Sequence, residues 1–249
     1  MRLVARIGII LFGAIAIAWA ALVLPVFQQQ QKPVAIAAAL ERGETYGLAT
    51  LLPQMNATAQ SNFFGFCNAA ARRANMIILT KVVEDPSVAE NRTLQDAAWQ
   101  KLDAATRSVL ACSPSDSLAW LMLFWLNMSK NGYSTEYGRY LQLSYDASPN
   151  EAAVALWRNR IVLDLNDRVP SKFTDLAVVE FVKLVNSERL YPEMGNVFER
   201  APPELQRRLA LALRTAEPRP REVFARMLLD RGVRANIPDT KSVQDRPWN

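Results

Sequence analysis

The chain has 249 residues and is 50% hydrophobic, which allows one medium-sized domain and a separate apolar segment. Its formal net charge of +5 is too small to predict nucleic-acid binding by itself. The sequence has no histidine, so it lacks the commonest general base and the commonest metal ligand. We therefore expect no enzymatic activity, no cofactor and no metal. Glycine is scarce, whereas alanine and leucine are abundant, which favours an all-helical fold.

The segment from Ile7 to Phe27 is apolar and contains no charged residue. At about 1.5 Å per residue it measures about 31 Å, close to the hydrocarbon core of about 30 Å. We therefore predict a tail at residues 1–6 and a transmembrane anchor at 7–27.

The orientation of this anchor follows from the charges beside it. Arg2 and Arg6 precede the segment and only Lys32 follows closely. The positive-inside rule then predicts a cytoplasmic tail and, in a bacterial inner membrane, a periplasmic C-terminal domain. A cleaved signal peptide is the alternative, since Ala18 to Ala20 reads as a cleavage site. The apolar run continues past that site to Phe27, which favours the anchor.

After the anchor we predict a helical domain at residues 33–235 and a disordered tail at 236–249. Residues 28–32 are polar and are expected to leave the bilayer. Short helices are expected at 35–41 and 46–52.

Two longer helices are predicted at residues 63–83 and 94–112, from apolar residues at helical spacing. A short link containing Pro86 suggests that they form an antiparallel hairpin. Cys67 and Cys112 would then lie side by side on the apolar faces, and we predict a disulfide between them. Two buried, reduced cysteines are the alternative.

An internal repeat follows. Ser113 to Asp116 (SPSD) recurs as Ser148 to Glu151 (SPNE) at an offset of 35 residues, with two predicted helices between. Trp120, Leu123 and Pro149 occupy the tryptophan, leucine and closing proline positions of the tetratricopeptide repeat, which this segment resembles over residues 113–165. The resemblance implies stacked antiparallel helical hairpins, a TPR-like α-solenoid.

The match departs from that family at other positions. The glycine position holds Phe124, the tyrosine position holds Asn127, and Gly138 lies only near the small alanine position. Independently of any family, residues 118–126 are apolar on all sides, so this helix must be covered from several directions.

Four further helices are predicted at residues 150–165, 173–185, 203–213 and 218–229. The apolar stripe of the second of these is predicted to be Leu176, Val179, Phe181, Val182 and Val185.

Arginine is concentrated between Arg189 and Arg234, where ten arginines and no lysine accompany six acidic residues. A solvated helical surface with local Glu–Arg pairs explains this pattern. The alternative is a patch for an anionic partner such as an acidic polysaccharide, because arginine pairs well with carboxylate and phosphate. The residues of this predicted arginine patch are Arg200, Arg207, Arg208, Arg214, Arg219 and Arg221.

The sequence contains no nucleotide-binding, nucleophile-elbow or zinc-protease motif. Because helical-repeat surfaces usually bind proteins, we expect a non-catalytic scaffold or assembly protein of the bacterial cell envelope with a protein partner. The layout resembles membrane-anchored accessory proteins of exopolysaccharide biosynthesis and export, which implies a role in assembling such a complex. The alternatives are an enzyme that acts on envelope glycans through a carboxylate pair, and a cytoplasm-facing adaptor.

Overall fold

The structure is a computed structural model that describes residues 2–54 and 67–240. Within these ranges every regular element is a helix, which confirms the predicted all-helical class. Contacts divide the chain into two compact units, Met1–Leu126 and Asn127–Asn249. The stacked-hairpin arrangement stays a prediction.

The helices of the first unit are α1 (Arg2–Glu41), α2 (Leu48–Leu51), α4 (Ala69–Glu84), α5 (Pro86–Glu90), α6 (Arg92–Cys112) and α7 (Ser117–Asn131), whose end belongs to the second unit. The second unit continues with α8 (Thr135–Ala147), α9 (Ala152–Leu165), α10 (Ser171–Asn186), α11 (Tyr191–Arg200), α12 (Pro203–Ala212) and α13 (Pro218–Asp230). Short 3₁₀ helices are η2 (Asn166–Arg168) and η3 (Leu213–Thr215).

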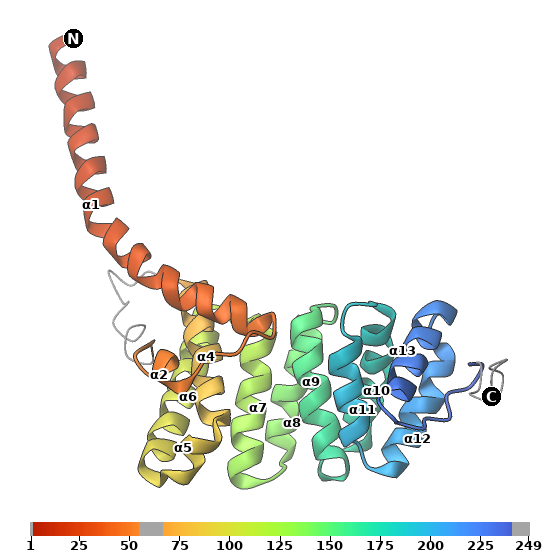
Figure 1. Ribbon diagram of the computed structural model, residues 1–249. Helices are drawn as coiled ribbons and strands as arrows, with labels where there is room; N and C mark the ends of the chain where they lie inside the picture. Colours follow the sequence, from red (N-terminus) through yellow and green to blue (C-terminus); the bar gives the residue numbers. More distant parts are fainter. Residues whose placement is uncertain (1, 55–66, 241–249) are drawn as a thin grey trace. The chain divides into compact units, whose positions relative to one another are not determined.

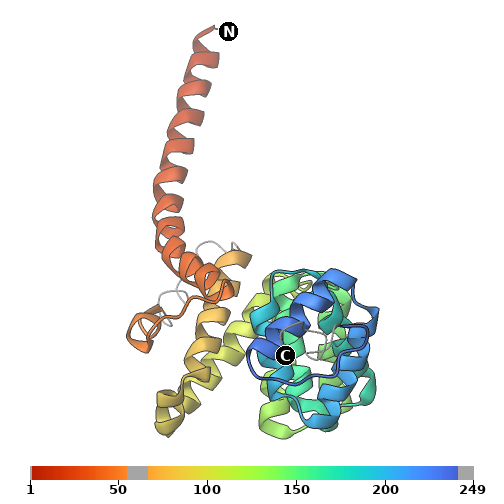
Figure 2. The same cartoon turned by 45° about the vertical axis from the view of Figure 1, so that its right-hand side comes forward.

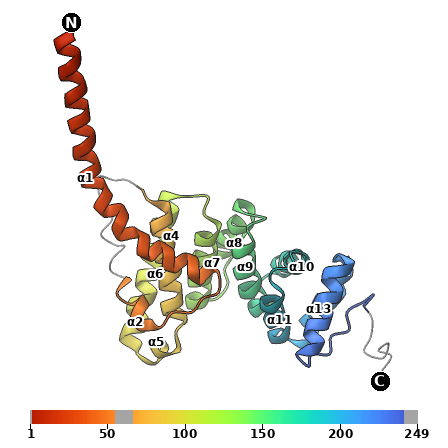
Figure 3. The same ribbon diagram turned by 45° about the horizontal axis from the view of Figure 1, so that its top comes forward.

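Helix α1 is one continuous helix (Figures 1 and 2). The prediction of a separate short helix at residues 35–41 is wrong, because α1 continues through the glutamines and through Pro33 to Glu41. Pro25 and Pro33 lie inside α1, and the helix bends along its length (Figure 3), as expected where proline removes a backbone hydrogen bond. The helix ends at Glu41, and Gly43 follows at φ +89°, a conformation that favours glycine.

The two parts of α1 have different surroundings. In the first part apolar side chains are exposed, with Ile9 at 73% and Phe12 at 75%. By length and composition this part can cross a membrane. In the second part Gln30, Ile36 and Leu40 are buried, because this part packs along α4.

Helices α4 and α6 pack along each other, and the predicted disulfide joins Cys67 to Cys112, with a Cα–Cα distance of 5.6 Å. Cys67 precedes α4 and is exposed, so its predicted place on a buried helical face is wrong. The helix predicted at residues 94–112 lies within α6, and its apolar residues Ala98, Leu102 and Val109 are buried at helical spacing. The predicted beginning of the first helix, residues 63–66, lies outside the described residues.

Helix α4 is buried on more than one face, because α1 covers it in addition to α6. Its residues from Met76 to Thr80 are all buried. Helix α7 shows the same burial from Leu121 to Phe124, as the apolar composition of this segment predicted.

The core of the second unit is aromatic. Phe224 of α13 meets the ring of Phe181 in α10 at 5.8 Å and that of Phe198 in α11 at 6.4 Å, both edge to face. The predicted stripe of α10 is wrong at two positions, since Leu176 and Val179 are exposed. The helix instead buries a face that includes Phe173, Ala177, Phe181 and Leu184.

The described part of the predicted tail, residues 236–240, has contacts with the second unit. Ile237 is buried, and the backbone carbonyl of Asp239 accepts a hydrogen bond from Arg221 at 3.4 Å. The remainder of the predicted tail lies outside the described residues.

The disulfide closes a loop that contains α4, α5 and α6, so its removal should increase the entropy of the unfolded chain. We expect the double variant Cys67→Ser/Cys112→Ser to lose about 2–4 kcal/mol of unfolding free energy. Urea unfolding of the full-length protein in detergent measures this loss, and reduced wild-type protein serves as the control. Equal stability of oxidised wild type and the double variant would contradict the prediction.

Candidate functional site

Five of the six arginines of the predicted arginine patch form ion pairs in the structure. Arg207 is paired with Glu204 in its own helix, whereas Arg208 is paired with Asp175 of α10. Exposed ion pairs of this kind contribute little to stability, about 0–1 kcal/mol. Their geometry favours the interpretation as a solvated surface with local pairs.

The other arginines of the patch have different surroundings. Arg214 and Arg221 approach the Asp239 carboxylate at 4.0 and 3.8 Å, and Arg219 approaches Glu188 at 4.0 Å. Arg221 is buried and donates to the backbone carbonyl of Arg214 at 3.1 Å, so it has a structural role. Within the described residues Arg200 alone of the six forms no ion pair. Anion binding by the patch stays a prediction.

A polar cluster in the first unit holds the second part of α1 to the helices beside it. Asn68 donates from its amide to the side chain of the buried Gln30. Arg73 of α4 binds the carboxylate of Asp116 at 3.1 Å and that of Glu41, the last residue of α1, at 3.4 Å. We call these five residues the anchor junction.

The anchor junction also organises the start of α7. The Asp116 carboxylate accepts a hydrogen bond from the backbone N–H of Ala119 at 2.9 Å. Such a contact satisfies one of the free N–H groups at a helix N-terminus. Arg73 and Asp116 therefore link three helices, α1, α4 and α7, at one place.

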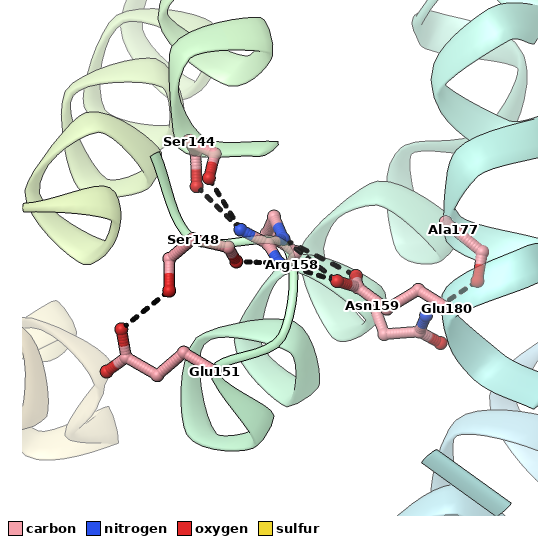
Figure 4. A network of polar contacts seen from close by, with 7 residues as sticks. All are labelled: Ser144, Ser148, Glu151, Arg158, Asn159, Ala177 and Glu180. Carbon is pink, nitrogen blue, oxygen red and sulfur yellow. Dashed lines mark hydrogen bonds and ion pairs between the residues drawn. The ribbon is translucent and has the colours of Figure 1, made fainter. Parts of the chain in front are cut away.

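The most buried polar site of the second unit surrounds Arg158 of α9, whose side chain is 0% exposed (Figure 4). Its Nη2 donates to Glu180 Oε1 of α10 at 2.6 Å, and its Nε donates to the same oxygen at 3.1 Å. Nη1 donates to the backbone carbonyl of Ser144 at 2.7 Å, and Nη2 to that of Ser148 at 3.0 Å. Next to it, Asn159 donates to the backbone carbonyl of Ala177 at 2.7 Å. We call this set the buried arginine network.

The position of Arg158 is explained by the end of α8. The last carbonyl groups of a helix have no partner within the helix, and they carry partial negative charge. Ser144 lies in the last turn of α8 and Ser148 is its C-cap. The guanidinium therefore caps α8, neutralises Glu180 and joins α8, α9 and α10 through one side chain.

Burial dominates the electrostatics of this site. It raises the pKa of Glu180, and the hydrogen bonds and charge of Arg158 act in the opposite direction. Burial also raises the pKa of the Tyr145 phenol, and the negative charge of Glu180 adds to that effect. The Tyr145 ring lies 4.6 Å from the guanidinium carbon of Arg158, a cation–π contact. Tyr145 is therefore expected to remain neutral.

Chemically, the buried arginine network is suited to holding helices together. The guanidinium uses its N–H groups on Glu180 and on the α8 carbonyls, so it is occupied by the protein's own acceptors. Among the described residues, no group of three or more His, Cys, Asp and Glu side chains is placed to hold a metal ion.

Sequence reasoning missed this network. A signal was present, because Arg158 and Glu180 are charged residues inside apolar helical runs (VALWRNRIV and AVVEFV). Glu180 also falls into the buried stripe of α10, at helical spacing from Phe173 and Ala177. Charged residues in such positions are rarely buried unless they are paired.

Removing one member of the buried pair should be costly, because the other charge remains buried without its counter-ion. We expect Arg158→Met and Glu180→Leu each to lose about 3–5 kcal/mol of unfolding free energy. The double variant Arg158→Met/Glu180→Leu should lose less unfolding free energy than the two single variants together. The loss that remains reflects the carbonyl groups of α8 that are no longer capped. Urea unfolding measures all three, with Arg139→Met, at an exposed position of α8, as the control. Additive losses would contradict the pairing.

The raised pKa of Glu180 also predicts a pH dependence. The folded protein binds this proton more tightly than the unfolded chain, so stability should fall as pH rises from the ordinary pKa of 4.5 through the raised value. The Glu180→Gln variant cannot titrate here. The difference in unfolding free energy between wild type and Glu180→Gln should therefore decrease with pH in this window and then become constant. Denaturation at a series of pH values tests this, and an increase would show that Arg158 outweighs burial.

Comparison of the chain with protein-family models, with curated proteins and with solved structures finds no match. The resemblances to tetratricopeptide repeats and to exopolysaccharide accessory proteins therefore stay predictions from the sequence.

Proposed function

We propose that this protein is a non-catalytic, membrane-anchored scaffold of the bacterial cell envelope. One observation carries the proposal: α1 is apolar and exposed in its first part and packs on α4 in its second part without a break. A helix of this kind would hold the first unit at a fixed position against the membrane. The polar sites described above bind the protein's own helices, which fits a structural role.

The proposed location is the inner membrane, with the helical units in the periplasm. The Cys67–Cys112 disulfide supports this side, because disulfides persist in oxidising compartments. The arginines that precede the apolar part of α1 support the same orientation. In the periplasm the protein would assemble a complex for polysaccharide synthesis or export, with its TPR-like helices as the binding surface.

Topology is tested by a maleimide mass-shift experiment on whole cells, denatured with and without prior reduction. We expect a shift only after reduction, because Cys67 and Cys112 are bridged in an oxidising compartment. Reaction without reduction would contradict the periplasmic location and would favour a cytoplasm-facing adaptor.

The scaffold role is tested by lysine-directed crosslinking of the full-length protein in native membranes. We expect one discrete, repeatedly recovered partner complex. Recovery of the monomer alone would contradict the scaffold role, whichever side of the membrane the units occupy.

A further inference from the structure

Two helices of the second unit leave apolar side chains in solvent. Leu176 and Val179 of α10 are 37% and 56% exposed, and Leu211 of α12 is 62% exposed. The opposite face of each helix is buried in the core, where Phe173, Phe181 and Leu209 lie. These three exposed side chains therefore do not contribute to the core of this unit.

The contacts between α10 and α12 bring these three residues together. Arg208 is paired with Asp175, and the backbone N–H of Glu217 donates to Asn186 at 3.0 Å. Both helices therefore run in the same direction with a fixed register. Leu211 follows Arg208 by one turn and Val179 follows Asp175 by one turn, so they lie beside each other. We call Leu176, Val179 and Leu211 the exposed strip.

Cations flank the exposed strip. Lys172, Leu176, Val179 and Lys183 follow one another at helical spacing along a single face of α10, and both lysines are exposed. In the part of the chain that the structure describes, neither lysine forms an ion pair. The nearby carboxylates of Asp175 and Glu204 are already paired with Arg208 and Arg207.

We infer that the exposed strip docks an amphipathic helix of a partner protein, with its apolar face on the strip and acidic side chains toward Lys172 and Lys183. This inference rests on the proposed scaffold function and names its partner surface. The stripe from Lys172 to Lys183 measures about 16 Å, which corresponds to about three turns of helix. Helix recognition of this kind uses apolar anchors spaced one turn apart, with charges that fix the orientation.

The charge distribution favours this occupant over two others. A second copy of the chain would bring two lysine-flanked strips together, and like charges would oppose each other. A membrane surface binds a helix with a large continuous apolar face, whereas the exposed strip consists of three side chains on two helices.

The test uses the photo-crosslinking residue p-benzoylphenylalanine in place of Val179 or Leu211 in the full-length protein in native membranes. The same residue in place of Leu143, an exposed leucine of α8, is the control. We expect adducts from the first two positions and none from the control. Mass spectrometry of the adduct should identify a partner segment with helical apolar spacing and an excess of Asp and Glu.

A charge reversal tests the acidic character of the partner. The double variant Lys172→Glu/Lys183→Glu should lower the crosslinking yield about fivefold, the effect of losing about 1 kcal/mol of ion pairing. The matched control is Lys130→Glu/Arg139→Glu, which reverses two exposed cations elsewhere in the second unit and should leave the yield unchanged.

Several results would overturn the inference: adducts to this chain itself, to lipid, or to a basic or extended segment, and a yield that the lysine variants do not change. If lysine-directed crosslinking captures a partner while Val179 and Leu211 give no adduct, the scaffold function stands and the docking surface is wrong. Failure of lysine-directed crosslinking itself would instead contradict the scaffold function.

Discussion

A helix that lies in the hydrocarbon core of a membrane can satisfy its backbone hydrogen bonds only within itself. In α1 this internal bonding continues past the apolar part into the part that covers α4. The first unit depends on this continuity. Without the second part of α1, one face of α4 would lie open, and Asn68 would lose the side chain of Gln30 as its hydrogen-bond partner.

Polar contacts in both units have the same function, namely to fix helices that apolar packing alone would allow to slide. In the first unit the Arg73 guanidinium reaches the end of α1 and the start of α7. In the second unit Arg158 reaches the end of α8 and a carboxylate of α10. Apolar contacts have no direction, whereas a guanidinium donates its hydrogen bonds in a fixed planar geometry. Only a few arrangements of its partners satisfy that geometry. Each arginine thus specifies the register of the helices around it.

The sequence predicted the class of the fold, most of the later helices and the disulfide, because these depend on local periodicity and on the spacing of Cys67 and Cys112. It did not predict the continuity of α1. The glutamines and Pro33 look like the end of a helix, and only packing on α4 explains why Gln30 is buried in one. The burial of α4 on several faces follows from the same contact.

The two misassigned residues of α10 and the buried arginine network have a related explanation. Leu176 and Val179 fit an apolar stripe by spacing, but the core selects a neighbouring face that contains Glu180. A charged residue is assigned to the surface unless its partner is known, and Arg158 lies on a different helix. Tertiary pairing therefore placed Glu180 inside and left Leu176 and Val179 outside.

The junction of α1 with α4 has a mechanical consequence. Gln30 lies three residues beyond Phe27, about 4.5 Å along the helix axis, so a membrane-embedded α1 would bring Asn68 and the adjoining disulfide close to the lipid headgroups. A pulling force on the helical units would then reach the bilayer through α4 and α1. Along the chain, that load would pass from Cys112 through the disulfide to Cys67, so the closed loop that contains α4, α5 and α6 would not be extended.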